Sequence, residues 1–309
     1  MSILKSLRRI IVSLSLIAWA GCVGRPRAQV SQRWADLAAP ARAAQLTQRA
    51  GTDLRYLAVP GARLRFIELS APAHVSTRPT LFVHGLGGGL GDFAPVMLLA
   101  LGSARLVAVD LPGSGGSTSQ QHDYSVDGSV RALAVFIERL GLAPVRLACH
   151  SLGGQICLAL ALEHRELVHD LTLVAPAGIY RREDFIREAT KRFGISTGQI
   201  GMRDPSRSFA ALLTHGDDVV LRRFVAHDPQ TIAALASFRE NLRERLHELR
   251  VPSLVIWGNR DPVLPMADGF ALAASAHDAT LRIVEGAGHS PQLSHPEKIH
   301  AWMRESFRQ

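Results

Sequence analysis

From about residue 53 to its end, the chain alternates between short apolar runs and longer segments with helical periodicity. Two segments, 54–59 and 64–69, alternate apolar and polar residues, which predicts an antiparallel hairpin at a sheet edge. Continuous apolar runs follow at 81–83, 106–109, 145–148, 171–174, 254–257 and 281–284, typical of strands buried on both faces. Helical patterns lie between them, over 125–140, 152–167 and 295–307. We therefore expect an α/β fold: a doubly wound, mostly parallel sheet of eight strands with helices on both faces.

The alternation breaks once, after Val174. A stretch of about seventy residues, helical and charged in pattern, precedes the next strand at Ser253. We expect 179–235 to form a helical cap insertion over the carboxyl ends of the strands, and 231–249 to form a long helix that returns to the sheet. The core domain then comprises 53–178 and 236–309.

The first 21 residues have the layout of a secretory signal, with basic residues followed by an apolar run over 10–18. That run is too short to cross a bilayer, which needs roughly twenty residues. Two processing sites compete. Cleavage after Ala20 gives a soluble exported protein, whereas Ala20-Gly21-Cys22 resembles the end of a bacterial lipobox and makes Cys22 a lipidation candidate.

We therefore expect export in a bacterium, either to the periplasm or as a lipoprotein held at a membrane surface through its N-terminus. The alternative is a cytoplasmic protein with an uncleaved N-terminus. Residues 22–52 form an N-terminal segment, and apolar residues at helical spacing predict a short amphipathic helix within 31–50.

The amino-acid composition limits the classes of partner and cofactor that we expect. Hydrophobic residues make up 47% and charged residues 20%, which is ordinary for a globular protein with a sizeable core. The net charge is +8, but the arginines are scattered among acids without runs or interleaved aromatics, so we expect no nucleic-acid partner. Three cysteines form no disulfide framework, and Cys149 and Cys157 are expected to be buried small residues. No cysteine or histidine pair has ligand spacing, so no metal or cofactor is expected.

The strongest chemical motif is Cys149-His150-Ser151-Leu152-Gly153-Gly154. A predicted strand ends at Ala148 and an apolar helix begins directly after Ser151, which is the strand–turn–helix context of a nucleophile elbow. The turn requires small residues two positions before and after the serine. Gly153 meets this requirement, and Cys149 is a tolerable replacement for the more common glycine. We therefore predict that Ser151 is a catalytic nucleophile.

A serine hydroxyl needs a base to take its proton. His289 follows the last predicted strand on a glycine-flanked loop, and Asp261 follows the strand before it. Open α/β sheets place their sites at the carboxyl ends of strands, so all three residues are expected to meet there. We predict that His289 is the general base and Asp261 the acid that orients it.

Other polar residues in this part of the chain receive structural roles. His84 and His150 are expected to hydrogen-bond within their own turns, and His295 precedes Pro296 at a predicted helix start. Asp110 is expected to shape its own loop, because an aspartate side chain can bond the backbone just ahead of it.

The glycine-rich loop from His84 to Gly89 follows the third predicted strand but lacks the Lys-Ser/Thr pair of a phosphate-binding loop. We predict that its Leu86 N–H, together with the Leu152 N–H, forms an oxyanion hole. Substrate-binding residues and oligomeric state stay open.

Taken together, these motifs resemble the α/β-hydrolase superfamily over about residues 60–305. Five motifs carry the resemblance in order: His84-Gly85, Asp110-Leu111-Pro112-Gly113-Ser114-Gly115, His150-Ser151-Leu152-Gly153-Gly154, Trp257-Gly258-Asn259-Arg260-Asp261 and Gly288-His289. The Ser…Asp…His order is also that of the superfamily. Short stretches at 125–128, 153–155 and 173–178 look most like the monoacylglycerol-lipase and bacterial esterase/lipase branch.

The resemblance implies a serine hydrolase that cleaves carboxylic esters with an apolar acyl chain, acting on a small-molecule or lipid ester (EC 3.1.1.-). Cys149 departs from the usual glycine, which bears on the level of activity rather than on the mechanism. Two alternatives stay open: a C–C bond hydrolase of ring-cleavage products, and a non-catalytic binding protein on a hydrolase fold.

Overall fold

The computed structural model describes residues 34–72, 78–120, 123–180 and 240–306, together with Pro229, Ala233 and Ser237. The expected signal segment with Cys22, and nearly all of the expected cap, lie outside these residues. The helices are α3 (Ala39–Ala50), α4 (Ala94–Leu99), α5 (Val126–Arg139), α6 (Leu152–Glu163), α11 (Met266–Ser275), α12 (Pro291–Ser294) and α13 (Pro296–Ser306), with 3₁₀ turns η1 (Arg165–Leu167) and η2 (Arg243–Glu248). The strands are β1 (Leu54–Val59), β2 (Ala62–Leu69), β3 (Thr80–Val83), β4 (Leu106–Val109), β5 (Thr118–Ser119), β6 (Val145–His150), β7 (Val168–Val174), β8 (Ser253–Gly258) and β9 (Ala279–Val284).

Eight strands form one sheet in the order β1-β2-β4-β3-β6-β7-β8-β9, and the ninth, β5, pairs with β2. Six strands run parallel to one another, namely β4, β3, β6, β7, β8 and β9. By contrast, β1 and β5 are antiparallel to β2, and β2 is antiparallel to β4. The expected hairpin is confirmed, and a strand forms at each of the six apolar runs. The expected two-sided burial is wrong for 281–284, because β9 is an edge strand in which only Val284 is buried. The count of eight strands is short by one, because β5 has only two residues and shows no alternation.

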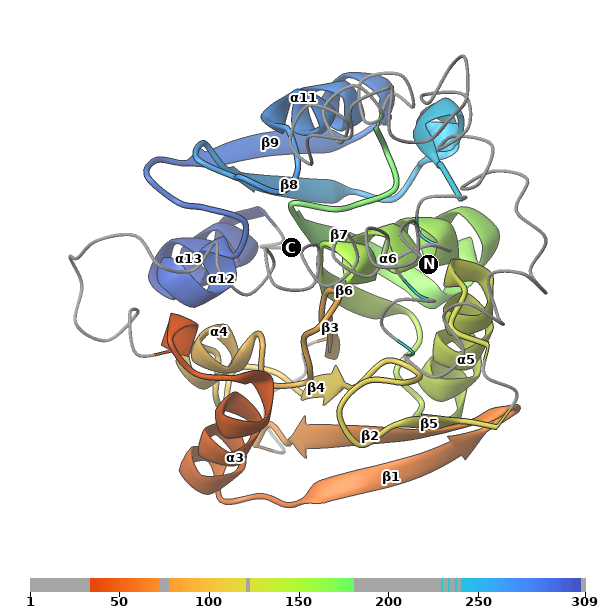
Figure 1. Ribbon diagram of the computed structural model, residues 1–309, viewed down its shortest axis with the longest axis vertical. Coiled ribbons are helices and arrows are strands. Elements are labelled where there is room, and N and C mark those ends of the chain that lie inside the picture. The colour runs from red at the N-terminus through yellow and green to blue at the C-terminus, as the bar shows by residue number, and fades with distance from the viewer. Residues whose placement is uncertain are drawn as a thin grey trace, which may run out of the picture.

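Helices cover both faces of the sheet (Figure 1). The strand side chains alternate between two cores. Leu81 and Val83 of β3 face a core shared with α5 and α6, whereas Phe82 faces a second core shared with α3, α4 and α13. This two-sided burial is the reason that the parallel strands are continuously apolar in sequence.

Helix α6, which follows Ser151, is buried on every side. Ten of its twelve residues are buried, from Leu152 to Ala161. By contrast, α5 is amphipathic and begins at Ser125, whose hydroxyl accepts a hydrogen bond from the Gly128 N–H at 2.9 Å.

The short amphipathic helix expected within 31–50 is confirmed as α3, which has Pro40 in its first turn, where a missing N–H is tolerated. Another helix differs from expectation. The expected long helix over 231–249 is wrong in its second half, where the chain is irregular at 240–242 and then forms η2. There the Asn241 side chain accepts from the Arg243 N–H, and the Leu242 N–H donates to the Gly178 carbonyl. Both bonds compete with helix continuation.

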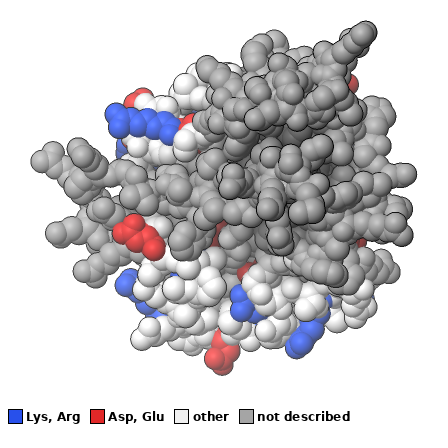
Figure 2. Space-filling view, in the orientation of Figure 1, with Lys and Arg blue, Asp and Glu red and all other residues white. Residues whose placement is uncertain are grey.

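Within the described residues, no helix has the length and apolarity that a membrane crossing requires. On the face shown in Figure 2, the described basic and acidic side chains are interspersed rather than gathered by sign.

Candidate active site

Ser151 lies in a sharp turn between β6 and α6. Its backbone has φ of 51° and ψ of −117°, a conformation that non-glycine residues seldom adopt. The tertiary structure holds this turn closed, because the Ser151 N–H donates to Val174 and its carbonyl accepts from Gln155 and Ala177. A Cβ at Gly153 would lie 2.3 Å from the His84 carbonyl oxygen, so the tight packing requires glycine there. The turn presents the Ser151 hydroxyl at the carboxyl edge of the sheet.

The structure brings Ser151, His289 and Asp261 together. The Nε2 atom of His289 lies 3.0 Å from the Ser151 Oγ, and its Nδ1 lies 2.8 Å from the Asp261 Oδ2. These contacts fit one tautomer of a neutral ring, in which Nδ1–H donates to the carboxylate and Nε2 accepts from the hydroxyl. The three residues follow β6, β9 and β8, so they converge at the sheet edge where the sequence placed them.

The Asp261 carboxylate is almost fully buried, with 1% of its side chain exposed. Its second oxygen, Oδ1, accepts hydrogen bonds from the N–H groups of Val263 and Leu264, at 2.7 and 3.0 Å. Both oxygens therefore have donors, and the two backbone bonds fix the orientation of the carboxylate toward the ring.

The loops that carry Asp261 and His289 are joined through their backbones. The Arg260 N–H donates to the Ala287 carbonyl at 2.9 Å, and the Asn259 Oδ1 accepts from the Gly286 N–H at 2.7 Å. A Cβ at Gly258 would lie 2.2 Å from the Gly288 carbonyl oxygen. This close approach fixes the separation of the two loops.

His150 contacts the main chain of the loop that carries His289. Its Nε2 lies 3.0 Å from the His289 carbonyl oxygen, while its buried Nδ1 has no hydrogen-bond partner among the described residues. Burial lowers the pKa of His150 to about 3, and the nearby His289 acts in the same direction. His150 is therefore a neutral donor that holds the main chain of His289.

The two expected oxyanion donors flank Ser151. Leu152 opens α6, and Leu86 follows Gly85, where a Cβ would lie 2.9 Å from the Ser151 Cβ. Within the described part of the chain, no acceptor takes a hydrogen bond from either N–H. Both groups are therefore available to an anion that forms at the serine.

The residues expected to be structural lie outside this constellation. The His84 Nε2 accepts from the Leu111 N–H, and its Nδ1 contacts the Gly85 carbonyl. Asp110 bonds the Gly116 N–H of its own loop, and it also accepts from the Leu90 N–H and pairs with Arg65. It thus joins two loops rather than one. His295 sits directly before α13, beside Ser294.

The expectation for two cysteines is wrong in one respect. Cys149 and Cys157 are buried, but they form a disulfide bond with their Cα atoms 6.5 Å apart. The bond joins the end of β6 to the second turn of α6, across the nucleophile turn. A count of three cysteines gave no sign of it, because strand and helix bring the two thiols together only after the turn has formed.

Sequence reasoning also missed a polar network behind the nucleophile. The Gln155 Nε2 donates to the carbonyls of Ser237 and Glu240, and its Oε1 accepts from the Ser237 hydroxyl. Burial raises the pKa of Glu240 to about 7, although its carboxylate accepts from the Val126 and Asp127 N–H groups. Gln155 therefore joins the first turn of α6 to the chain that returns from the expected cap. The motif Gly153-Gly154-Gln155 was the only sequence signal for this network.

No group of three or more His, Cys, Asp or Glu side chains within the described ranges could hold a metal ion.

Comparison with known proteins finds similar sequences and a similar fold among hydrolases. A sequence model described as the Alpha/beta hydrolase family matches residues 80–302. Monoacylglycerol lipase abhd6-A of Xenopus laevis is 29% identical over 241 residues, covering 71% of this chain and 72% of that protein. The 2-hydroxy-6-oxo-6-(2'-aminophenyl)hexa-2,4-dienoic acid hydrolase of Metapseudomonas resinovorans is 24% identical over 257 residues, covering 79% and 87%. The crystal structure of a bacterial membrane phospholipase A superposes with a TM-score of 0.65 at 22% identity, covering 87% of this chain and 92% of that one.

Proposed function

The chain belongs to the alpha/beta hydrolase family, and on that premise we propose that it cleaves carboxylic esters through an acyl-enzyme on Ser151. The observation that carries the proposal is the pair of contacts at His289, 3.0 Å to the Ser151 Oγ and 2.8 Å to the Asp261 Oδ2. Hydrolase activity is supported by the family and by the relatives named as lipases.

In the proposed reaction, the Ser151 Oγ attacks the ester carbonyl carbon and its proton passes to the His289 Nε2. The carbonyl oxygen becomes an oxyanion, which the Leu86 and Leu152 N–H groups stabilise by about 3 kcal/mol each. Asp261 stabilises the imidazolium. His289 then protonates the leaving alcohol, and the acyl group remains on Ser151.

Water completes the cycle. His289 takes a proton from a water molecule, and the resulting hydroxide attacks the acyl carbonyl. Collapse of the second tetrahedral intermediate breaks the bond to the Ser151 Oγ, which recovers its proton from His289. The products are a carboxylic acid and an alcohol.

An apolar acyl chain fits the described surroundings. Leu86 and Leu264 are partly buried apolar side chains on the loops that carry the oxyanion donor and the acid. The relatives named monoacylglycerol lipases act on such an ester according to their names. We further propose that residues 179–235 form a cap over this site.

We also propose that the protein is exported in a bacterium, to the periplasm or to a membrane surface through a lipid on Cys22. The Cys149–Cys157 disulfide supports export, because disulfides persist in oxidising compartments and are rare in the cytosol. Cell fractionation of the full chain and of Cys22→Ser tests this. Membrane retention that is lost in the variant supports lipidation, and recovery of both proteins in the cytosol would contradict export.

The central test is turnover of p-nitrophenyl esters of graded chain length by the purified protein and by Ser151→Ala. The variant is expected to lose at least about 10³-fold in kcat, because the nucleophile is absent. Ser290→Ala is the matched control, since Ser290 lies beside the base and its side chain caps no helix. Full ester activity in Ser151→Ala would overturn the proposal.

A second candidate is hydrolysis of a C–C bond in ring-cleavage products, favoured by the similarity to the Metapseudomonas resinovorans hydrolase. Turnover of a vinylogous 1,5-diketone without turnover of any ester would select it. If neither substrate reacts and a fluorophosphonate probe leaves Ser151 unlabelled, the protein is a binding protein on this fold.

A further inference from the structure

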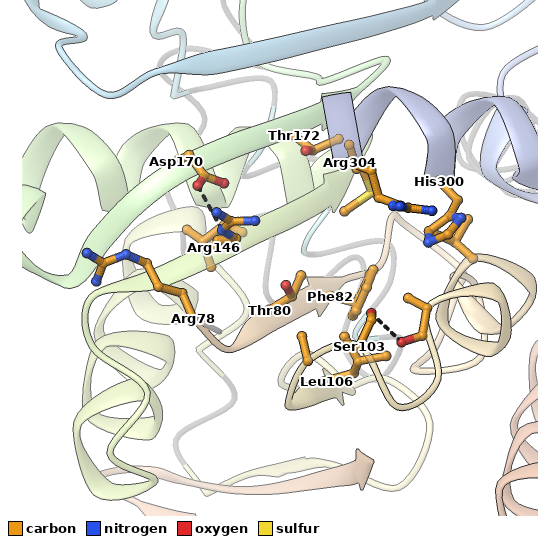
Figure 3. A pocket seen from close by; sticks show the side chains of 15 residues that line it. Arg78, Thr80, Phe82, Ser103, Leu106, Arg146, Asp170, Thr172, His300 and Arg304 are labelled. Carbon is orange, nitrogen blue, oxygen red and sulfur yellow. Dashed lines mark hydrogen bonds and ion pairs between the residues drawn. The ribbon is translucent and has the colours of Figure 1, made fainter. Parts of the chain in front are cut away.

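A cavity of about 260 Å³ lies toward the amino ends of the parallel strands, between the sheet and helices α4 and α13 (Figure 3). Thr80 and Leu106, the first residues of β3 and β4, line it, as does Arg146 at the start of β6. Ser151 is five residues beyond Arg146, a distance of roughly 16 Å along an extended strand. The cavity is therefore separate from the candidate active site, and no residue of that site lines it.

Basic side chains dominate the charge around this cavity. Arg78, Arg146 and Arg304 line it, against one acid, Asp170. Arg146 pairs with Asp170 at 3.2 Å, and the same carboxylate oxygen contacts the His169 ring. Arg78 and Arg304 form no ion pair with any residue in the described ranges. Arg78 nevertheless interacts electrostatically with Asp170. Arg304 lies on the opposite side of the cavity (Figure 3), so its guanidinium group is the one available to an anion.

The cavity also has hydroxyls without partners. Thr80 and Thr172 are 6% and 1% exposed, and both line the cavity. Neither hydroxyl hydrogen-bonds a residue that the structure describes. A ligand oxygen in the cavity could therefore accept a hydrogen bond from either hydroxyl.

The rest of the lining is apolar. Phe82, Val96, Leu106 and Met303 line the interior, between β3, β4, α4 and α13. Apolar walls favour a hydrocarbon body, and arginines favour a carboxylate, which their planar groups bind with two hydrogen bonds. Inorganic anions match the arginines but not the apolar walls, and neutral lipids match the apolar walls but not the arginines.

We propose that this cavity binds a medium-chain aliphatic carboxylate, with its head group at Arg304 and its chain against Phe82 and Met303. The volume is below the roughly 300–1,000 Å³ of pockets for drug-sized ligands, which favours a chain of about eight carbons over a long one. The site does not depend on ester hydrolysis, because it shares no residue with the proposed machinery.

Photolabelling with a diazirine-bearing octanoate, followed by mass spectrometry, tests the location. Labelled residues, located by fragment-ion spectra, are expected to belong to α4 or α13, and octanoate should compete whereas octylamine should not. Labels confined to Ser151, Asp261, His289 or the residues directly beside them would place the ligand in the other site and overturn the proposal. That result would leave the proposed hydrolysis untouched.

Calorimetric titration with octanoate tests the contacts. Arg304→Gln is expected to weaken binding at α13 about tenfold, the effect of one charge-assisted hydrogen bond. The isosteric Thr172→Val, which keeps the packing, should weaken it a fewfold. Lys298→Gln is the matched control, because it removes an exposed charge from the same helix without lining the cavity, and it should bind as the parent does.

Two outcomes contradict the proposal. Equal affinity in Arg304→Gln and the parent, with both folded by circular dichroism, would remove the role of Arg304. Acetate or inorganic phosphate binding as tightly as octanoate would remove the role of the apolar walls.

Discussion

His150 donates a hydrogen bond from its Nε2 to the main-chain carbonyl of His289, over 3.0 Å. The residue before the candidate nucleophile therefore positions the backbone of the candidate base. Because burial lowers the pKa of His150 to about 3, this donor is neutral near neutral pH.

The same burial predicts how stability depends on pH. In the unfolded chain His150 has an ordinary pKa near 6.5, so between pH 6.5 and 3 the unfolded state binds more protons. Its contribution to stability is present above pH 6.5 and is lost as the pH falls toward 3, by roughly 3 kcal/mol at pH 4. His150→Asn should show a shallower loss of unfolding free energy between pH 7 and pH 4. His247→Asn, at an exposed position, is the control, and parallel slopes for His150→Asn and the parent would refute this account.

Asp261→Asn should disturb the orientation of the His289 ring without weakening substrate binding. The Val263 and Leu264 N–H groups still have an oxygen to bond, but the amide NH₂ then faces the His289 Nδ1 and favours the wrong ring tautomer. We expect kcat to fall by about 10³- to 10⁴-fold with KM little changed. Steady-state kinetics on the preferred ester measure both. The exposed Asp278→Asn should leave kcat unchanged, and a comparable loss there would point to a general effect of charge.

Gly258→Ala should displace the base loop. Its Cβ would lie 2.2 Å from the Gly288 carbonyl oxygen and 2.4 Å from that of Ala287, so the backbone around His289 must move. We expect a loss of at least about tenfold in kcat, because small misplacements of catalytic groups are costly. Gly286→Ala is the contrast, since its Cβ meets open space and only its φ of 78° is unfavourable. It should lower stability by about 1 kcal/mol with activity retained. Equal activity in both variants would argue against the contact.

Removal of the disulfide should affect stability more than activity. Alanine fits the small position before the nucleophile turn, so Cys149→Ala/Cys157→Ala is expected to keep its kcat within a fewfold. The short loop closed by the bond contributes about 2–3 kcal/mol in the chain-entropy view, measurable by urea unfolding. Thiol alkylation before and after reduction supplies the independent check. Two additional alkylated cysteines are expected after reduction, and an unchanged number would show that the bond is absent.

Sequence patterns were most informative where one strand faces two cores. The runs at 81–83 and 254–257 identified β3 and β8, because strands buried on both faces need apolar residues at every position. The positions of Ser151, Asp261 and His289 followed from the same pattern, since each residue comes just after a strand and parallel strands end at one edge.

Features that depend on tertiary contacts were not accessible in this way. The Cys149–Cys157 bond requires the turn to form first, and the helix over 231–249 is broken by a bond from Leu242 to the distant Gly178. The cavity beside Arg304 combines residues from four strands and two helices, and no local pattern marks their approach.

The complete burial of α6 has a consequence for genetic work on this protein. Its apolar and glycine positions contact strands or neighbouring helices, so substitutions from Gly153 to Ala161 will reduce yield by disturbing packing. A library screened for activity would therefore mark the whole segment as intolerant. Abundance must be measured alongside turnover before any inactive clone in this segment is assigned a chemical role.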